Sequence, residues 1–445
     1  MQKIKLIISL IIVISSFGIT EAQEVKKFSL QQALDYAMNN NYDLIRSEMD
    51  IDIAKQRIKE STSTGLPQIN ASIGYNDNIA RPTMILPPEF SPDPSLREVQ
   101  FGTKYDATLG ASASQLVFSG EYIVGLKAAK KYLESTNAEL FKNKVAVKQQ
   151  VANSYYNVLT VERSLVIIDT TLKITRNLAE ETRQIFEVGL NEDIDVDQLE
   201  LLVSDMEATK VNFENQRILA YSYLKFYLGL NEQDSIVLTD NIDSLIYNLE
   251  ASSYLSEKFE INTNPDFFLL QKQKELTSLQ VDLEKASYLP SINAFLNYQT
   301  MAQRDEWNFF DSGKWYPSAT FGVTMNIPIF SSGTRASKLK QAKLVFDQIN
   351  VQENQLKNQL NLQYINARNN FINQYKVYVN KEKNRKVAEK IYRKTTEKYS
   401  QGLASSLDIL NTHNQFLTAE SEFLTASLSY LEAGEELKKV LSKSY

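Results

Sequence analysis

The stretch Tyr399-Ser-Gln-Gly-Leu-Ala-Ser-Ser-Leu-Asp-Ile409 joins two long runs that contain neither Gly nor Pro, residues 334–401 and 403–433. A chain free of these two residues favours helix. A helix as long as the first run measures roughly 100 Å, at about 1.5 Å per residue. Gly402 accepts the left-handed backbone conformation that ends a helix. The stretch therefore predicts a long helical hairpin that reverses its direction at Gly402.

The same hairpin occurs earlier in the chain. Residues 126–188 and 190–228 also lack Gly and Pro, and Gly189 separates them. The turn Phe186-Glu-Val-Gly-Leu-Asn-Glu-Asp-Ile-Asp-Val196 matches the later turn in its aromatic, Gly-Leu, Asp and β-branched positions. A second similarity links Leu66-Pro-Gln-Ile-Asn-Ala71 with Leu289-Pro-Ser-Ile-Asn-Ala294. The chain is therefore interpreted as a tandem duplication of helix, two strands, long helix, turn and shorter helix.

The composition argues against several classes of chemistry. The 445 residues include no Cys, and His413 is the only His. The sequence thus lacks thiol nucleophiles, disulfides and most ligands of transition metals, and we expect no lipid-anchoring cysteine. A formal net charge of −6 argues against binding of nucleic acid. Without a phosphate loop or a nucleophile elbow, the sequence predicts no enzyme, no cofactor and no metal site.

Residues 1–22 have the pattern of a secretory signal peptide. Lys3 and Lys5 precede an apolar run at residues 6–14, and small residues lead to Ala22. We expect cleavage near Ala22. The alternative is a single membrane-spanning helix, although the apolar run is shorter than the ~20 residues that a span needs.

Four segments alternate apolar with small polar residues, as strands do. They lie at about residues 67–76, 105–118, 290–299 and 315–330, and the segments between paired strands are expected to be external loops. The pattern fits a soluble sheet with one wet face, and it also fits a transmembrane β-barrel whose apolar face meets lipid. The signal peptide favours the barrel. Four strands are too few to close a barrel and open edges are not tolerated in lipid, so several chains would have to share one.

The first long run carries a heptad pattern with one inserted step of four. Its positions are Leu126, Leu133, Leu140 and Val147, then Val151, Val158, Leu165, Leu172 and Ala179. This pattern predicts coiled-coil packing, which an ordinary solvated coiled coil would explain equally well.

The domain organisation follows from the repeats. Residues 23–230 form the first repeat, residues 231–264 an insertion of mixed character, and residues 265–445 the second repeat. Residues 236–238 are predicted to form a short strand in the insertion. We expect the insertion and the polar tail ending at Tyr445 to form a small equatorial collar around the long helices.

The order and spacing of these features resemble the TolC family of outer-membrane efflux channels. The resemblance covers the whole mature chain and rests on the helix start Asn39-Asn-Asn-Tyr-Asp-Leu44, the Leu-Pro before each first strand, and the Gly-Leu-x-x-x-x-Asp turn of each hairpin. It implies a mainly α fold in which three chains share one transmembrane β-barrel, four strands from each. Below the barrel, antiparallel helical hairpins would form an α-barrel belted by the collar.

The resemblance also implies roles for the two turns, which would form the closed periplasmic aperture and contact a periplasmic adaptor protein. The matching tip residues are Val188, Gly189, Leu190, Gln401, Gly402 and Leu403. Asp408 matches an aperture carboxylate of the family, whereas Asn411 stands where a second acid is often found. Asp195 and Asp197 on the first tip add negative charge near the aperture. The alternative is that these acids only complement the positive end of a helix dipole.

These features predict an outer-membrane channel of a tripartite efflux or type I secretion system. Such a channel would be a passive exit duct, a homotrimer in contact with outer-membrane lipid and with a periplasmic extension. Its partners would be a periplasmic adaptor and an inner-membrane pump, and nucleic acid is not expected. The alternative is a secreted or periplasmic coiled-coil structural or adhesion protein, which would not need detergent for extraction.

Overall fold

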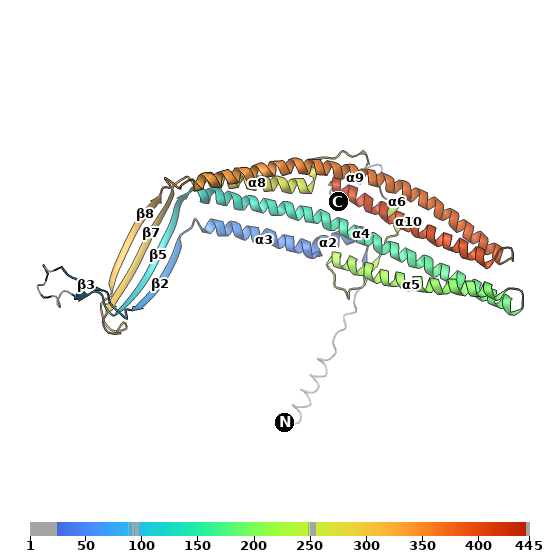
Figure 1. The fold of residues 1–445 in the computed structure, drawn as a ribbon, viewed down its shortest axis with the longest axis horizontal. Helices are drawn as coiled ribbons and strands as arrows, with labels where there is room; N and C mark the ends of the chain where they lie inside the picture. Colours follow the sequence, from blue (N-terminus) through green and yellow to red (C-terminus); the bar gives the residue numbers. More distant parts are fainter. Residues whose placement is uncertain are drawn as a thin grey trace, which may run out of the picture. The chain divides into compact units, whose positions relative to one another are not determined.

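Helices dominate the chain in its computed structural model, which describes residues 25–87, 89–90, 93, 98–247, 249 and 255–441 (Figure 1). The expected signal peptide with its cleavage position Ala22, and the terminal Tyr445, lie outside the described residues. In chain order the elements are β1 (Lys26–Phe28), α2 (Leu30–Asn40), α3 (Tyr42–Ser63), β2 (Gln68–Asp77), β3 (Thr83–Ile85), β4 (Glu98–Gln100), β5 (Tyr105–Ser119), α4 (Gly120–Glu187), α5 (Asp193–Leu228), β6 (Ile236–Leu238), α6 (Ile242–Tyr247), a 3₁₀ turn (Ile261–Thr263), α8 (Pro265–Ala286), β7 (Ser291–Arg304), β8 (Tyr316–Asn326), α9 (Thr334–Tyr399) and α10 (Ser406–Leu441).

The chain divides into two units. The first comprises the described residues of 1–49, 138–269 and 354–445, and the second those of 50–137 and 270–353. The hairpins α4–α5 and α9–α10 reverse in the first unit, and the sheet lies in the second. None of the helices in the described ranges is both long and apolar enough to cross a membrane.

The core of the first unit follows the heptad pattern of α4. Val147, Val151 and Val158 are buried there together with Leu224 of α5 and Leu437 of α10. Nearer the turns, Leu172 packs with Leu202 and Met206, and Leu178 packs with Leu199 and Ile409. The apolar seam of the long helix therefore holds the two hairpins together within this unit.

Short elements connect the insertion, residues 231–264, to this core. β1 pairs in parallel with β6, so Phe28 belongs to a strand. Helix α2 begins at Leu30, and Ser29 and Gln32 form its capping box. The buried Tyr155 hydroxyl lies 3.0 Å from the Phe28 carbonyl and 2.9 Å from the Asp240 carboxylate. The described part of the C-terminal tail continues α10, with Leu437 and Leu441 in the same core.

The second unit contains an antiparallel sheet of order β2-β5-β7-β8. Its register places Ile69, Ala113, Leu296 and Phe321 in one row across the four strands. The adjacent row is polar, formed by Asn70, Ser112, Asn297 and Thr320. Because side chains alternate along a strand, the apolar residues of all four strands share one face of the sheet.

The strand boundaries differ from the expected ones in three places. The strand expected at about 290–299 continues to Arg304, whose guanidinium donates to the Lys314 carbonyl at 3.0 Å. The strand expected at about 315–330 ends at Asn326, because Pro328 has no N–H for the ladder. Part of the first external loop forms a hairpin of β3 and β4, in which Met84 lies opposite Val99.

Candidate functional site: the two helical tips

The first tip is a left-handed turn that ends α4. Gly189 has φ +81°, and its N–H donates to the Phe186 carbonyl at 2.8 Å. The N–H of Leu190 donates to the Ile185 carbonyl at 3.1 Å, which completes a Schellman-type end. Val188 and Leu190 are 70% and 77% exposed. The turn therefore presents two apolar side chains to its surroundings.

The second tip repeats this geometry. Gly402 has φ +71°, its N–H donates to the Tyr399 carbonyl at 2.9 Å, and the Leu403 N–H donates to the Lys398 carbonyl at 2.8 Å. Leu403 is 71% exposed, and Gln401 is also exposed. The similar turn sequences thus fold to similar backbone turns, each with an exposed leucine directly after the glycine.

Asp408 belongs to the helix start that follows the second tip. Its carboxylate accepts hydrogen bonds from the Ser405 backbone N–H at 2.9 Å and from the Ser405 hydroxyl at 2.8 Å. These bonds, the backbone one foremost, hold the pKa of the Asp408 carboxyl below its usual range. Asn411 lies exposed one turn further along α10. Asp408 is thus a capping residue that stays ionised, and its charge remains open to solvent.

Asp195 has a different environment from Asp408. The Ser406 hydroxyl donates to the Asp195 carboxylate and also lies 2.9 Å from the Gln198 side-chain oxygen. Ser406 is buried, and Asp195 is partly exposed at the start of α5. Asp197 is exposed, two residues further along the helix and therefore on another face. The structure brings Asp195 next to the helix start that contains Asp408.

Serine and tyrosine residues at the tips were not among the residues singled out from the sequence. Ser406 bonds one tip to the other, and a second link joins Thr182 of α4 to the Tyr399 hydroxyl at 2.8 Å. Between the turns lies a cavity of about 350 Å³, lined in part by Thr182, Asp195, Tyr399 and Ser406. The Ser405-x-x-Asp408 spacing signals the cap, but no local pattern signals the contact between residues 211 positions apart.

Among the residues that the structure describes, no group of three or more His, Cys, Asp or Glu side chains is placed to hold a metal ion. The tips are therefore best described as two linked, acidic helix starts with exposed apolar turns.

Comparison with known proteins identifies the family. The sequence matches the outer membrane efflux protein family over residues 33–230 and 260–443. It is 24% identical over 320 residues to the outer membrane protein TolC of Vibrio cholerae, covering 72% of this chain and 68% of that protein. It is also 24% identical over 427 residues to the probable efflux pump outer membrane protein TtgC of Pseudomonas putida, covering 93% and 82% of the two chains.

Solved structures show the same fold. CusC has a TM-score of 0.71 at 16% identity, with 93% of this chain and 91% of that chain covered. The Vibrio cholerae outer membrane protein VceC has a TM-score of 0.68 at 16% identity, with 93% and 96% covered. The chain therefore belongs to the outer membrane efflux protein family, and its function is that of an outer-membrane exit channel.

Proposed function

We propose that three copies of this chain form an exit duct for tripartite efflux or type I secretion. Each copy contributes four strands to one shared transmembrane β-barrel and two helical hairpins to an α-barrel that extends into the periplasm. Residues 231–264 and the end of α10 form the collar, and residues 1–22 are removed as a signal peptide near Ala22.

The four-stranded sheet is the main observation that supports this proposal. Its apolar row includes Ile69, Leu296 and Phe321, which are exposed in the single chain. Exposed apolar side chains on one face of a sheet suit contact with lipid. Strands β2 and β8 lie at the two edges of the sheet, and neither has a further partner among the described residues. Such edges need partner strands in a membrane, because lipid cannot satisfy their N–H and C=O groups.

The strand directions allow copies of the chain to pair with one another. The strands alternate in direction across the sheet, and their number is even. β8 of one copy can therefore pair antiparallel with β2 of the next, and closure after three copies leaves no free edge.

The long helices of the first unit also present apolar surface for neighbouring copies. Exposed apolar residues recur along α5 and along α9. On α9, Ile365 and Val379 are two heptads apart, and on α5, Val211 and Ile218 are one heptad apart. Stripes with this spacing pack against other helices in coiled coils. We assign these stripes to contacts between copies in the α-barrel.

The tips are the proposed contact with partner proteins. Val188, Leu190 and Leu403 are exposed apolar residues on well-defined turns, which suits docking of a periplasmic adaptor. An inner-membrane pump joined through that adaptor would supply the energy for transport. Asp195, Asp197, Asp408 and Asn411 are proposed to line the aperture.

Disulfide cross-linking tests the shared barrel directly, since the natural chain contains no Cys. The variants place one cysteine on the polar face of each edge strand. They combine Ser72→Cys on β2 with either Ser318→Cys or Thr320→Cys on β8. After oxidation in outer membranes, we expect covalent dimers and trimers on a denaturing gel for at least one pair. Each single-cysteine variant is the matched control and should remain monomeric. A soluble, uncross-linked monomer would instead favour the coiled-coil structural protein.

A further inference from the structure

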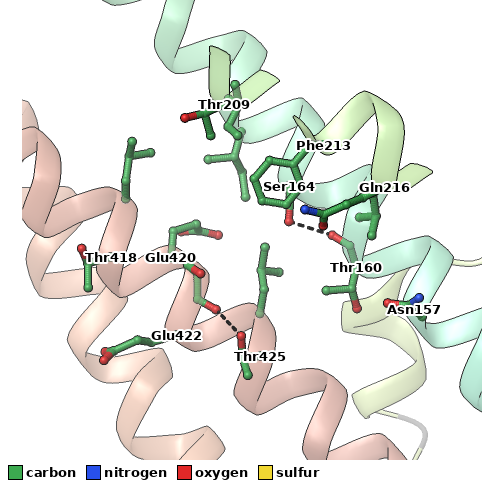
Figure 2. A pocket seen from close by; sticks show the side chains of 16 residues that line it. Asn157, Thr160, Ser164, Thr209, Phe213, Gln216, Thr418, Glu420, Glu422 and Thr425 are labelled. Atoms are coloured by element: carbon green, nitrogen blue, oxygen red, sulfur yellow. Dashed lines mark hydrogen bonds between the residues drawn. The ribbon is translucent and has the colours of Figure 1, made fainter. Parts of the chain in front are cut away.

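A cavity of about 600 Å³ lies within the first unit, between α4, α5 and α10 (Figure 2). It is separate from the tips, since none of the tip residues described above lines it. Small-molecule sites in proteins span roughly 300–1,000 Å³, so the volume suits a drug-sized ligand. One part of its lining is apolar, with Phe213, Leu417 and Leu424 among its residues.

The hydroxyl groups around the cavity are mainly acceptors for a ligand. Thr160 and Ser164 donate their hydroxyl protons to carbonyls four residues earlier in α4, at 2.8 and 3.0 Å. Thr209 of α5 and Thr425 of α10 do the same, at 2.8 and 2.9 Å. Figure 2 shows two of these bonds as dashed lines. A hydroxyl has one proton and two lone pairs, so each of these groups still offers an acceptor and no donor.

A buried carboxylate on α10 adds a strong acceptor to the cavity lining. Glu420 is 4% exposed, and its nearest cation is the Arg385 guanidinium at 3.6 Å. Arg385 also pairs with Glu389 at 3.3 Å, so one cation is shared between two carboxylates. Burial raises the pKa of the Glu420 carboxyl, with Arg385 and Arg163 opposing that shift. The second acid of the lining, Glu422, is paired with Lys381 at 2.7 Å.

We propose that this cavity binds an amphipathic organic cation that carries N–H donors. The N–H groups of the cation donate to Glu420 and to hydroxyl oxygens of the lining, while the aromatic or aliphatic body packs against Phe213 and the leucines. When the ligand replaces Arg385 as the partner of Glu420, Arg385 remains paired with Glu389. This site goes beyond the exit-duct function and does not depend on it, because binding is independent of transport.

The test is binding of ethidium, an aromatic cation with two amino groups as N–H donors, to the purified full-length protein in detergent. Fluorescence anisotropy should show saturable binding to the natural protein. Glu420→Gln should weaken it by about tenfold or more, since a charge-assisted hydrogen bond contributes roughly 1.5–3 kcal/mol. The matched control is Glu207→Gln, an acid of α5 that pairs with Arg176 outside the cavity. Its binding constant should stay within about twofold of the natural one.

Two further comparisons distinguish binding in this cavity from non-specific binding of ethidium to the protein or the detergent. Thr418→Trp fills the cavity from its exposed side and should abolish binding even if Glu420→Gln folds poorly. Tetraphenylphosphonium, a cation without N–H donors, should bind much more weakly than ethidium. Three results would overturn the proposal. They are no binding of ethidium, equal affinity for ethidium and tetraphenylphosphonium, and an equal loss of ethidium affinity in Glu207→Gln and Glu420→Gln. The mass of the same sample in detergent reports on the trimer separately.

Discussion

At the scale of single residues, His413 is an unusual core residue. Its side chain is 0% exposed on α10, and neither ring nitrogen has a hydrogen-bond partner within the described ranges. Tyr392 of α9 packs edge-on against it, with ring centroids 5.4 Å apart. Burial lowers the pKa of the His413 imidazole to about 4, because no group nearby compensates a positive charge. The residue is therefore neutral in the folded chain.

This burial predicts a specific pH dependence of stability. Above pH 6.5 the imidazole is neutral in both folded and unfolded chains, so it contributes no pH dependence. Between pH 6.5 and about 4 only the unfolded chain binds the proton, so stability falls as the pH falls, by up to about 3 kcal/mol. Below about pH 4 the imidazole is protonated in both states, so its contribution to the free energy of unfolding no longer changes with pH.

Melting of the detergent-solubilised protein from pH 7.5 to 4.5 measures the His413 effect. His413→Leu should flatten the decrease relative to the natural protein, while carboxylates titrate in both. Tyr392→Phe is the control, since it changes the same contact without removing the titrating group. Parallel pH profiles for the natural protein and His413→Leu would show that the imidazole is not buried in solution.

At the scale of elements, the two tips depend on backbone conformation. Gly402 adopts φ +71° with no atom within 4 Å of an added Cβ, so a substitution there meets backbone strain and not a clash. The left-handed conformation costs an L-residue about 1–2 kcal/mol. A bulky β-branched residue should therefore reshape the turn and alter the presentation of Leu403.

Transport measurements test the tip. Gly402→Val should reduce adaptor-dependent efflux while leaving the trimer and its membrane insertion intact, and Gly189→Val should act in the same way. Gly125→Val is the matched control: this glycine is in the helix α4, and it also has open space around its Cβ. Normal efflux in both tip variants would rule out these turns as the adaptor contact.

At the scale of the whole molecule, the acids of the tips would act as rings. In the proposed trimer, three copies of Asp408 around the threefold axis would form a carboxylate ring, and Asp195 would form a second one. Hydrogen bonds from Ser405 lower the pKa of the Asp408 carboxyl, so its charge persists to lower pH than that of an ordinary aspartate. A pore lined in this way favours cations over anions.

Single-channel recording tests the rings. Asp408→Asn keeps an acceptor for the Ser405 cap and removes the charge, so it should lower the cation preference and weaken block by multivalent cations without unfolding the tip. The loss should be partial, because the carboxylate of Asp195 remains. Asp243→Asn, an exposed acid on α6, is the control. Unchanged selectivity in Asp408→Asn, Asp195→Asn and the double variant would leave these acids only a capping role.

Local patterns were sufficient to predict much of the secondary structure. Long runs without Gly and Pro predicted α4 and α9, the glycine between each pair of runs predicted the turns, and period-two alternation predicted the four long strands. These features depend on backbone conformation and on side-chain periodicity, which neighbouring residues encode. The predicted strand boundaries were less accurate where a pairing partner decides them, as at Arg304, which pairs with Tyr105 of β5.

The sequence by itself determined the helices, the turns and the two-sided character of the strands, because each depends on residues a few positions apart. Only the tertiary structure decided which residues from separate segments meet: Ser406 on Asp195, Tyr155 on Asp240, and Arg385 beside Glu420. The same holds for the burial of His413 and for the cavity of α4, α5 and α10. These features arise from packing between segments far apart in the chain. The heptad pattern marks the buried face of α4, but no local pattern specifies which helices pack against it.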